Sequence, residues 1–192
     1  MQEGATVQTW FAAMTKRGHA SMFARPSNAE KCIVECQTAE EWARSVAAEG
    51  GSAVTEISSC SSDPPDCVGL RDGLPIKIEL AELLHGNALH RVDVARRKGL
   101  AGLSFDELQW NDTLFRERVN AILNRKQEKL ASANLTIDAL VIHTDEPWLS
   151  PHQMRIWTPT EAFARRSNIT TAYLLRTYVP NYAAHWPVFK IY

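Results

Sequence analysis

The fold is decided by residues 63–82, which read DPPDCVGLRDGLPIKIELAE. At the centre of this stretch, Asp72-Gly73 is a strong signal for a two-residue hairpin, because both residues tolerate the positive φ that such turns require. If these residues form the turn, counting back along the two strands places Asp66 directly opposite Glu79. Directly opposed residues point to the same face of a sheet, with Cβ atoms about 5 Å apart. The stretch therefore predicts two carboxylates side by side.

Two carboxylates at this separation repel each other unless a proton or a cation lies between them. Hard divalent cations bind carboxylate oxygens, so Asp66 and Glu79 are candidate ligands for Mg²⁺ or Mn²⁺. In the second strand, residues of one parity are aliphatic and should face a core, namely Ile76, Ile78 and Leu80. Lys77 has the opposite parity and shares the face of Glu79. A solvated hairpin with scattered salt bridges is the alternative interpretation of these charges.

An Asp after a Pro, a hairpin, and a strand of the form aliphatic-Glu-x-x-Glu together resemble the core of the PD-(D/E)xK nuclease superfamily. The resemblance covers roughly residues 38–145, as an order of elements more than as identity. It implies a restriction-endonuclease-like α/β fold with a central mixed β-sheet flanked by helices. It also implies magnesium bound by Asp66 and Glu79, with a backbone carbonyl near Leu80 as a further ligand. The lysine that the superfamily carries two residues after the Glu is Ala81 here.

Two lysines are candidates to replace the one that Ala81 lacks. Lys77 lies two residues before Glu79 on the same strand face. Lys126 belongs to a predicted helix from Asp112 to Leu130, capped by Asn111 or Asp112. The apolar stripe of that helix comprises Phe115, Val119, Ile122, Leu123 and Leu130. Lys126 falls inside the stripe and should point toward the sheet, unless it snorkels to water; Lys129 leans off the stripe.

An acidic residue on the first helix often completes the metal site in the superfamily. The sequence Thr38-Ala39-Glu40-Glu41 is a capping box and predicts a helix from Thr38 to about Glu49. Glu41 is therefore the candidate for this role, although the capping box alone would explain it. Glu56, on the strand that follows, is an equal alternative.

The remaining elements follow from periodicity, caps and turn residues. Lys31 to Glu35 is either a strand or the start of a helix. Strands are predicted at 52–58, 66–70, 76–81, 137–143 and 170–179, with an edge segment at 187–192, and helices at 87–102 and 158–166. Residues 1–192 form a single domain with an N-terminal extension at 1–28 that has no clear pattern.

Composition narrows the classes of protein. A chain of 192 residues with 45% hydrophobic content can bury one substantial core. It has no apolar run near 20 residues and no signal peptide, which predicts a cytoplasmic protein without a membrane partner. Four cysteines without zinc-finger spacing predict free thiols. A net charge of −1 gives no overall attraction for nucleic acid, so any contact would need a local basic group, either at 91–98 or at 116–129.

The resemblance to the PD-(D/E)xK superfamily implies a metal-dependent nuclease acting on DNA or RNA, with DNA favoured, and it is compatible with a homodimer. The substitution at Ala81 leaves two alternatives open. One is an impaired nuclease-like fold that binds nucleic acid or protein without cutting. The other is a structural or regulatory protein with no such site.

Overall fold

The structure is a computed structural model, and it describes residues 28–85, 109–146, 149–159, 162–177 and 185–192. Residues 1–27 of the predicted N-terminal extension and the helix predicted at 87–102 lie outside these residues, and residue 28 is the first residue of a helix. The described elements are α2 (Asn28–Ala48), β1 (Val54–Ser59), β2 (Cys67–Arg71), β3 (Leu74–Glu82), α4 (Asp112–Ser132), β4 (Ile137–Thr144), α5 (Pro151–Trp157), β5 (Ile169–Arg176) and β6 (Val188–Lys190).

The strands form one six-stranded mixed sheet in the order β1-β2-β3-β4-β5-β6. β1, β2 and β3 are joined antiparallel, β4 lies parallel to both β3 and β5, and β6 pairs antiparallel with β5. Helix α4 is the crossover between β3 and β4, as a parallel connection requires. The α/β class and the mixed sheet flanked by helices, which the sequence predicted, are confirmed.

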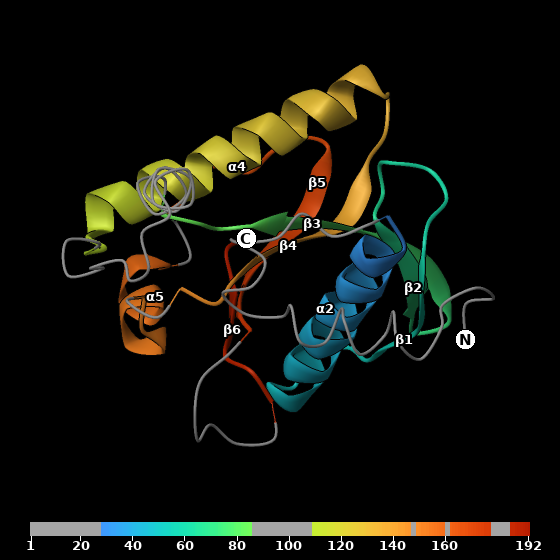
Figure 1. The fold of residues 1–192 in the computed structure, drawn as a ribbon, viewed down its shortest axis with the longest axis horizontal. Helices are drawn as coiled ribbons and strands as arrows, with labels where there is room; N and C mark the ends of the chain where they lie inside the picture. Colours follow the sequence, from blue (N-terminus) through green and yellow to red (C-terminus); the bar gives the residue numbers. More distant parts are fainter. Residues whose placement is uncertain (1–27, 86–108, 147–148, 160–161, 178–184) are drawn as a thin grey trace, which may run out of the picture.

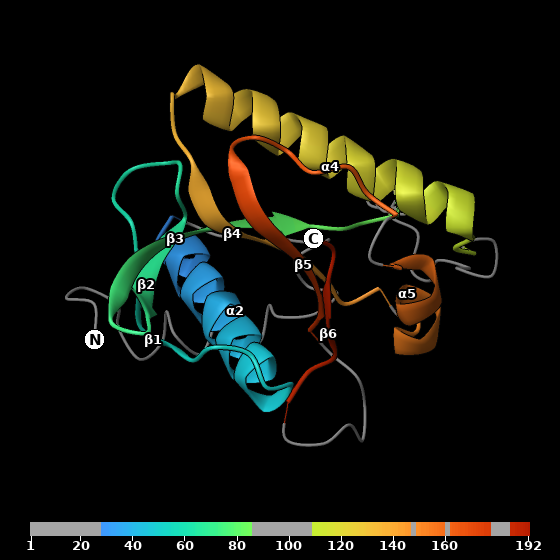
Figure 2. The ribbon, with the colours of Figure 1, turned by 180° about the vertical axis from the view of Figure 1, so that it is seen from behind.

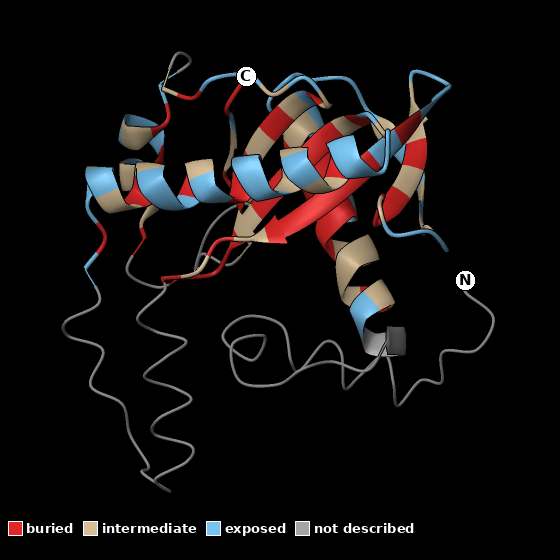
Figure 3. Ribbon diagram, turned by 90° about the horizontal axis from the view of Figure 1, so that it is seen from above, coloured by how far each residue is buried: buried red, intermediate tan, exposed pale blue. Residues whose placement is uncertain are grey.

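Helices α2 and α4 lie on opposite faces of the sheet (Figures 1 and 2). The strands between them are apolar on both faces, as expected for strands covered on both sides. Leu140 and Ile142 of β4 pack in the core with α4, whereas Ala139 and Val141 pack in the core with α2. Figure 3 shows the same layering as buried strands beneath an α4 whose outer surface is exposed. The parity of a strand residue thus decides which helix it meets.

The hairpin between β2 and β3 has the predicted turn. Asp72 and Gly73 have φ of 52° and 78°, the positive values that a type I′ turn needs at both central positions. The register runs from Arg71 opposite Leu74 to Cys67 opposite Ile78. One further step along this register brings Asp66 opposite Glu79, as the sequence predicted.

Helix α4 also agrees with the sequence. The side chain of Asn111 accepts a hydrogen bond from the Leu114 N–H and caps the helix. The buried residues of α4 are the five predicted ones, Phe115, Val119, Ile122, Leu123 and Leu130. The helix extends two residues beyond its predicted end, to Ser132.

The first described helix is longer than predicted. α2 begins at Asn28, ten residues before the capping box at Thr38, so Lys31 to Glu35 are helical. Thr38 is buried inside the helix, and its hydroxyl donates to the carbonyl of Val34 at 2.8 Å. This hydroxyl bond to the preceding turn replaces the cap that the sequence predicted, and Glu41 therefore lies in the middle of a helix and not at its start.

The helix predicted at 158–166 is wrong. The helix in this region is α5, which ends at Trp157 and has Thr158 as its C-cap. Ser150 and Gln153 form the capping box of α5, and Pro151 occupies its first turn. The same cap chemistry occurs twice in this stretch of sequence, and the earlier copy starts the helix because Met154 can then enter the core. None of the helices among the described residues has the length and apolarity to cross a membrane.

Candidate metal centre

Asp66 and Glu79 are held together by backbone hydrogen bonds. The N–H of Asp66 donates to Oε2 of Glu79 at 3.2 Å, and the N–H of Leu80 donates to Oδ2 of Asp66 at 2.8 Å. Glu79 lies in β3 with no exposed area, and Asp66, immediately before β2, is 9% exposed. Each carboxylate thus has one oxygen fixed by the backbone of the other strand, which fixes both side chains in position.

A third carboxylate joins this pair. Asp63, in the loop before β2, has a carboxylate oxygen that lies within 4.8 Å of ligand atoms of both Asp66 and Glu79. Oxygens on opposite sides of a bound Mg²⁺ are about 4.2 Å apart, so small side-chain movements would bring all three into its coordination range. The chemistry of this donor set, all hard anionic oxygen, suits Mg²⁺ or Mn²⁺. The residues present therefore fit a divalent ion.

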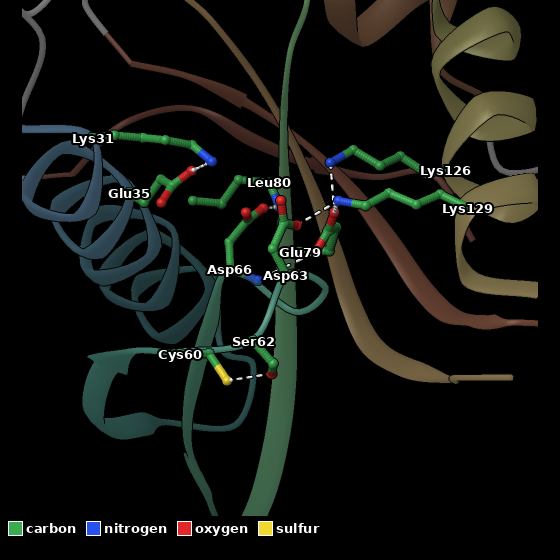
Figure 4. Close-up of polar contacts among 10 residues, drawn as sticks. All are labelled: Lys31, Glu35, Cys60, Ser62, Asp63, Asp66, Glu79, Leu80, Lys126 and Lys129. Atoms are coloured by element: carbon green, nitrogen blue, oxygen red, sulfur yellow. Dashed lines mark hydrogen bonds and ion pairs between the residues drawn. The ribbon is translucent and has the colours of Figure 1, made fainter. Parts of the chain in front are cut away.

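Two lysines from α4 approach the carboxylates from the other side (Figure 4). Nζ of Lys126 donates to Oε1 of Glu79 at 2.6 Å, and Nζ of Lys129 lies 3.4 Å from the same oxygen. Lys129 also pairs with Oδ1 of Asp63 at 2.5 Å. Lys126 points toward the sheet, as its place in the apolar stripe predicted, and its side chain is only 13% exposed. Lys129 contacts the site too, although the sequence favoured it less.

Lys77 does not contact this centre. Its side chain is exposed, and its backbone N–H donates to Oδ2 of Asp138 at 2.8 Å. Within the described parts of the chain, no ion pair joins it to Asp66 or Glu79. Of the two candidates for the missing lysine, only Lys126 is adjacent to the carboxylates.

The acidic residue that α2 brings nearest to the centre is Glu35, which the sequence did not single out. Glu35 is 17% exposed, pairs with Lys31 at 3.3 Å and points toward Asp66 (Figure 4). Burial and the negative charge of Asp66 raise the pKa of Glu35 to about 7. The helical periodicity from Lys31 through Glu35 is the signal that could have identified it.

Glu41 is not part of the acidic group. It is buried on the same helix, 7% exposed, and stands outside the Asp63, Asp66 and Glu79 cluster. It lies six positions after Glu35, which at about 100° per residue places the two on different sides of α2. Glu56, the alternative, is exposed on β1 and is also outside the cluster.

Asp63 and Lys129 shift each other's pKa. The hydrogen bond from Lys129 lowers the pKa of Asp63 below its usual value. Burial alone would lower the pKa of Lys129, but its hydrogen bond to Asp63 and the charge of Glu79 raise it instead. Both groups therefore stay charged near neutral pH, and the centre combines negative and positive charges a few ångströms apart.

The cysteines make no metal site of their own in the described part of the chain. All four are free, and the acidic cluster is the one group of three or more potential ligands found among the described residues. Leu80 takes part through its N–H, as given above, and the role of its carbonyl stays a prediction.

Comparison with known proteins adds no further assignment. No family model matches the chain, and no match was found among curated proteins or among solved structures. The function must therefore be argued from the site.

Proposed function

We propose that this protein is a metal-dependent nuclease of the PD-(D/E)xK type with a restriction-endonuclease-like fold. The observation that carries the proposal is the arrangement around Glu79, where Asp66 and Asp63 lie on one side and Lys126 on the other. The element order, with three antiparallel strands, a crossover helix and a parallel strand, supports the same proposal. Support also comes from the hairpin register, which brings the two motif carboxylates together.

The chain's own residues divide the chemistry between them. Asp66 and Glu79, with Asp63 beside them, would hold the ion through their carboxylates. A bound divalent cation supplies an activated water and neutralises charge on the phosphate. Lys126 would stabilise the negative charge of the attacking hydroxide or of the transition state, the role of the lysine that the superfamily carries at the position of Ala81. Glu35, at the α2 side, would hold a water or contribute a further carboxylate.

The alternative, a nuclease-like module that binds without cutting, is favoured by Ala81. This residue is buried in the core that α4 covers, where a lysine would not fit without disturbing the packing. The position therefore cannot regain the lysine easily, and catalysis depends on Lys126 taking its place.

Cleavage of supercoiled plasmid in Mg²⁺, with EDTA as the blank, tests the proposal. Glu79→Gln should reduce nicking by about 1,000-fold or more, because it removes a ligand that only the charged carboxylate provides. Lys77→Met is the matched control and should cut at the wild-type rate, since Lys77 does not contact the centre. Equal residual nicking by wild type and Glu79→Gln would contradict the nuclease assignment, and salt-sensitive DNA binding without nicking would favour the alternative.

A further inference from the structure

Helix α4 has two flanks with different partners. The flank toward β5 is fixed by polar contacts: Gln127 bonds the side chain and backbone of Asn168, and Asn124 accepts hydrogen bonds from Arg166. The flank toward the carboxylates carries Lys129, which contacts Asp63 and Glu79. These contacts fix the rotation of α4 about its axis, so the direction of every other side chain on it follows from helical geometry.

Three cations share the flank that faces the carboxylates. At about 100° per residue, Arg118, Arg125 and Lys129 lie within about 40° of one another around the helix axis. At about 1.5 Å per residue they form a row about 16 Å long. The two acidic residues on the outer side of α4, Glu117 and Glu128, are at least about 60° away toward solvent. The row is therefore uninterrupted by negative charge, and its Lys129 end lies at the candidate metal centre.

Arg118 and Arg125 have no polar partner among the residues that the structure describes. Both are exposed, and neither makes an ion pair or a hydrogen bond with any residue that the structure describes. Arg116, on the same flank as Gln127, instead pairs with Asp112 at 2.6 Å. Two exposed guanidinium groups that no described residue pairs with, in line with the proposed phosphodiesterase centre, are available for phosphate oxygens.

We propose that this row, Arg118–Arg125–Lys129, is the docking surface for the backbone of duplex DNA, and that it aligns one strand with the carboxylates at Glu79. The inference rests on the proposed function and names its substrate. A B-DNA strand places a phosphate about every 3.4 Å along its axis, so the row spans about five phosphates. A straight, rigid row suits a stiff duplex. Single-strand binders rely on aromatic stacking platforms, and the surface of α4 between Leu114 and Ser132 on this flank has no aromatic residue.

Fluorescence anisotropy with a labelled duplex, in EDTA to prevent hydrolysis, tests the surface. The double variant Arg118→Glu with Arg125→Glu should weaken binding at least 10-fold. The plot of log K against log salt should flatten by about two units, roughly 0.9 for each phosphate that the protein no longer neutralises. The matched control is Arg44→Glu with Lys190→Glu, which changes the net charge equally at two exposed positions on α2 and β6. The control should bind within about 3-fold of wild type, because only groups that touch phosphates release counterions.

Several outcomes would contradict the assignment of this row as the docking surface for duplex DNA. Equal weakening in both double variants would mean that net charge alone matters, and wild-type binding by both would place the DNA elsewhere on the protein. Tighter binding of single-stranded DNA or of RNA than of the duplex would assign another partner. Circular dichroism melting of each variant confirms that the fold is retained, which these exposed positions should allow.

Failure of this inference can be told apart from failure of the nuclease assignment. If wild type nicks plasmid in a Glu79-dependent manner while the α4 double variant binds and cuts normally, the nuclease assignment is supported and the docking surface is contradicted. If the duplex binds through the row but no metal supports cutting, the docking surface is supported and the nuclease assignment is contradicted.

Discussion

Two glutamates, Glu79 and Glu146, are completely buried, and their carboxylates are held by different sets of donors. Oε1 of Glu146 accepts the N–H of His85 at 2.8 Å, and its own N–H donates to Thr144 at 3.2 Å, so it ties β4 to the end of β3. One oxygen of Glu79 also accepts a backbone N–H, from Asp66, but the other is held by lysine side chains, and the carboxylate lies within reach of two further carboxylates. Backbone donors cannot leave, whereas ammonium groups can move aside for a cation. The comparison indicates that a buried charge can serve as a binding site when at least one of its partners is exchangeable.

Removing each glutamate should therefore affect stability very differently. Glu146→Ala leaves the N–H of His85 without this acceptor inside the protein and should lower the free energy of unfolding by about 3 kcal/mol. Glu79→Ala should lower it by less, about 1 kcal/mol, because relief of repulsion with Asp66 offsets part of the cost of the lost ion pair and of the Asp66 N–H that loses its acceptor. Urea unfolding in EDTA measures both. A larger loss for Glu79→Ala would show that its role is structural.

Substitution of Lys126 has the next largest expected effect. Lys126→Met keeps the apolar stem and removes the ammonium group, and it should lower the cleavage rate by about 100-fold. The same change should strengthen Mn²⁺ binding in calorimetry, since the competing cation on Glu79 is gone. A parallel loss of metal binding and cleavage would instead indicate that Lys126 only supports the fold.

The sequence could predict the part of this centre that depends on counting along regular elements. The turn at Asp72-Gly73 gave the register of Asp66 and Glu79, and the apolar stripe of α4 gave the direction of Lys126. The sequence could not predict the contacts that depend on how separate segments of the chain pack against one another. Asp63 reaches the site across two prolines in a loop, and Lys129 reaches it because a flexible four-carbon side chain extends past the stripe.

Glu35 was missed for a different reason. The capping box at Thr38 is a local signal, and packing of α2 on the sheet extends the helix past it. Ile33 is buried and Cys36 packs against the core that contains Trp42, and because both residues precede Thr38, their burial favours a helix that begins before the predicted cap. The misplaced helix at 158–166 is the same kind of error, since caps are frequent and the core decides which of them is used.

The pKa of Glu35 predicts how stability depends on pH without metal. Its folded pKa of about 7 lies above the value near 4.5 of an exposed glutamate, so the folded state holds the proton more tightly. Wild type should therefore lose about 2 kcal/mol as pH rises from 4.5 to 7.5 through this group. Glu35→Gln should lack that part of the loss in EDTA-buffered thermal melts. Parallel curves for the two proteins would contradict the raised pKa.

The smallest expected effect is at the edge of the centre. Asp63 is exposed and its ion pair with Lys129 is worth little in water, so Asp63→Asn should change stability by less than about 0.5 kcal/mol. If its carboxylate joins the ion, Mn²⁺ affinity should fall by about 3- to 10-fold in calorimetry. Ser62→Ala, at the neighbouring exposed position, is the control and should bind as wild type does.

The two-residue turn at the tip of the hairpin has a consequence for how this chain can change. Glu79 lies six residues beyond Gly73, about 20 Å along the strand. Inserting or deleting one residue at the tip would turn Glu79 toward α2 and away from the lysines. A change in the length of the turn would thus separate the charged groups without altering any of them. The chemistry of the site therefore depends on the length of this turn as well as on the acidic residues.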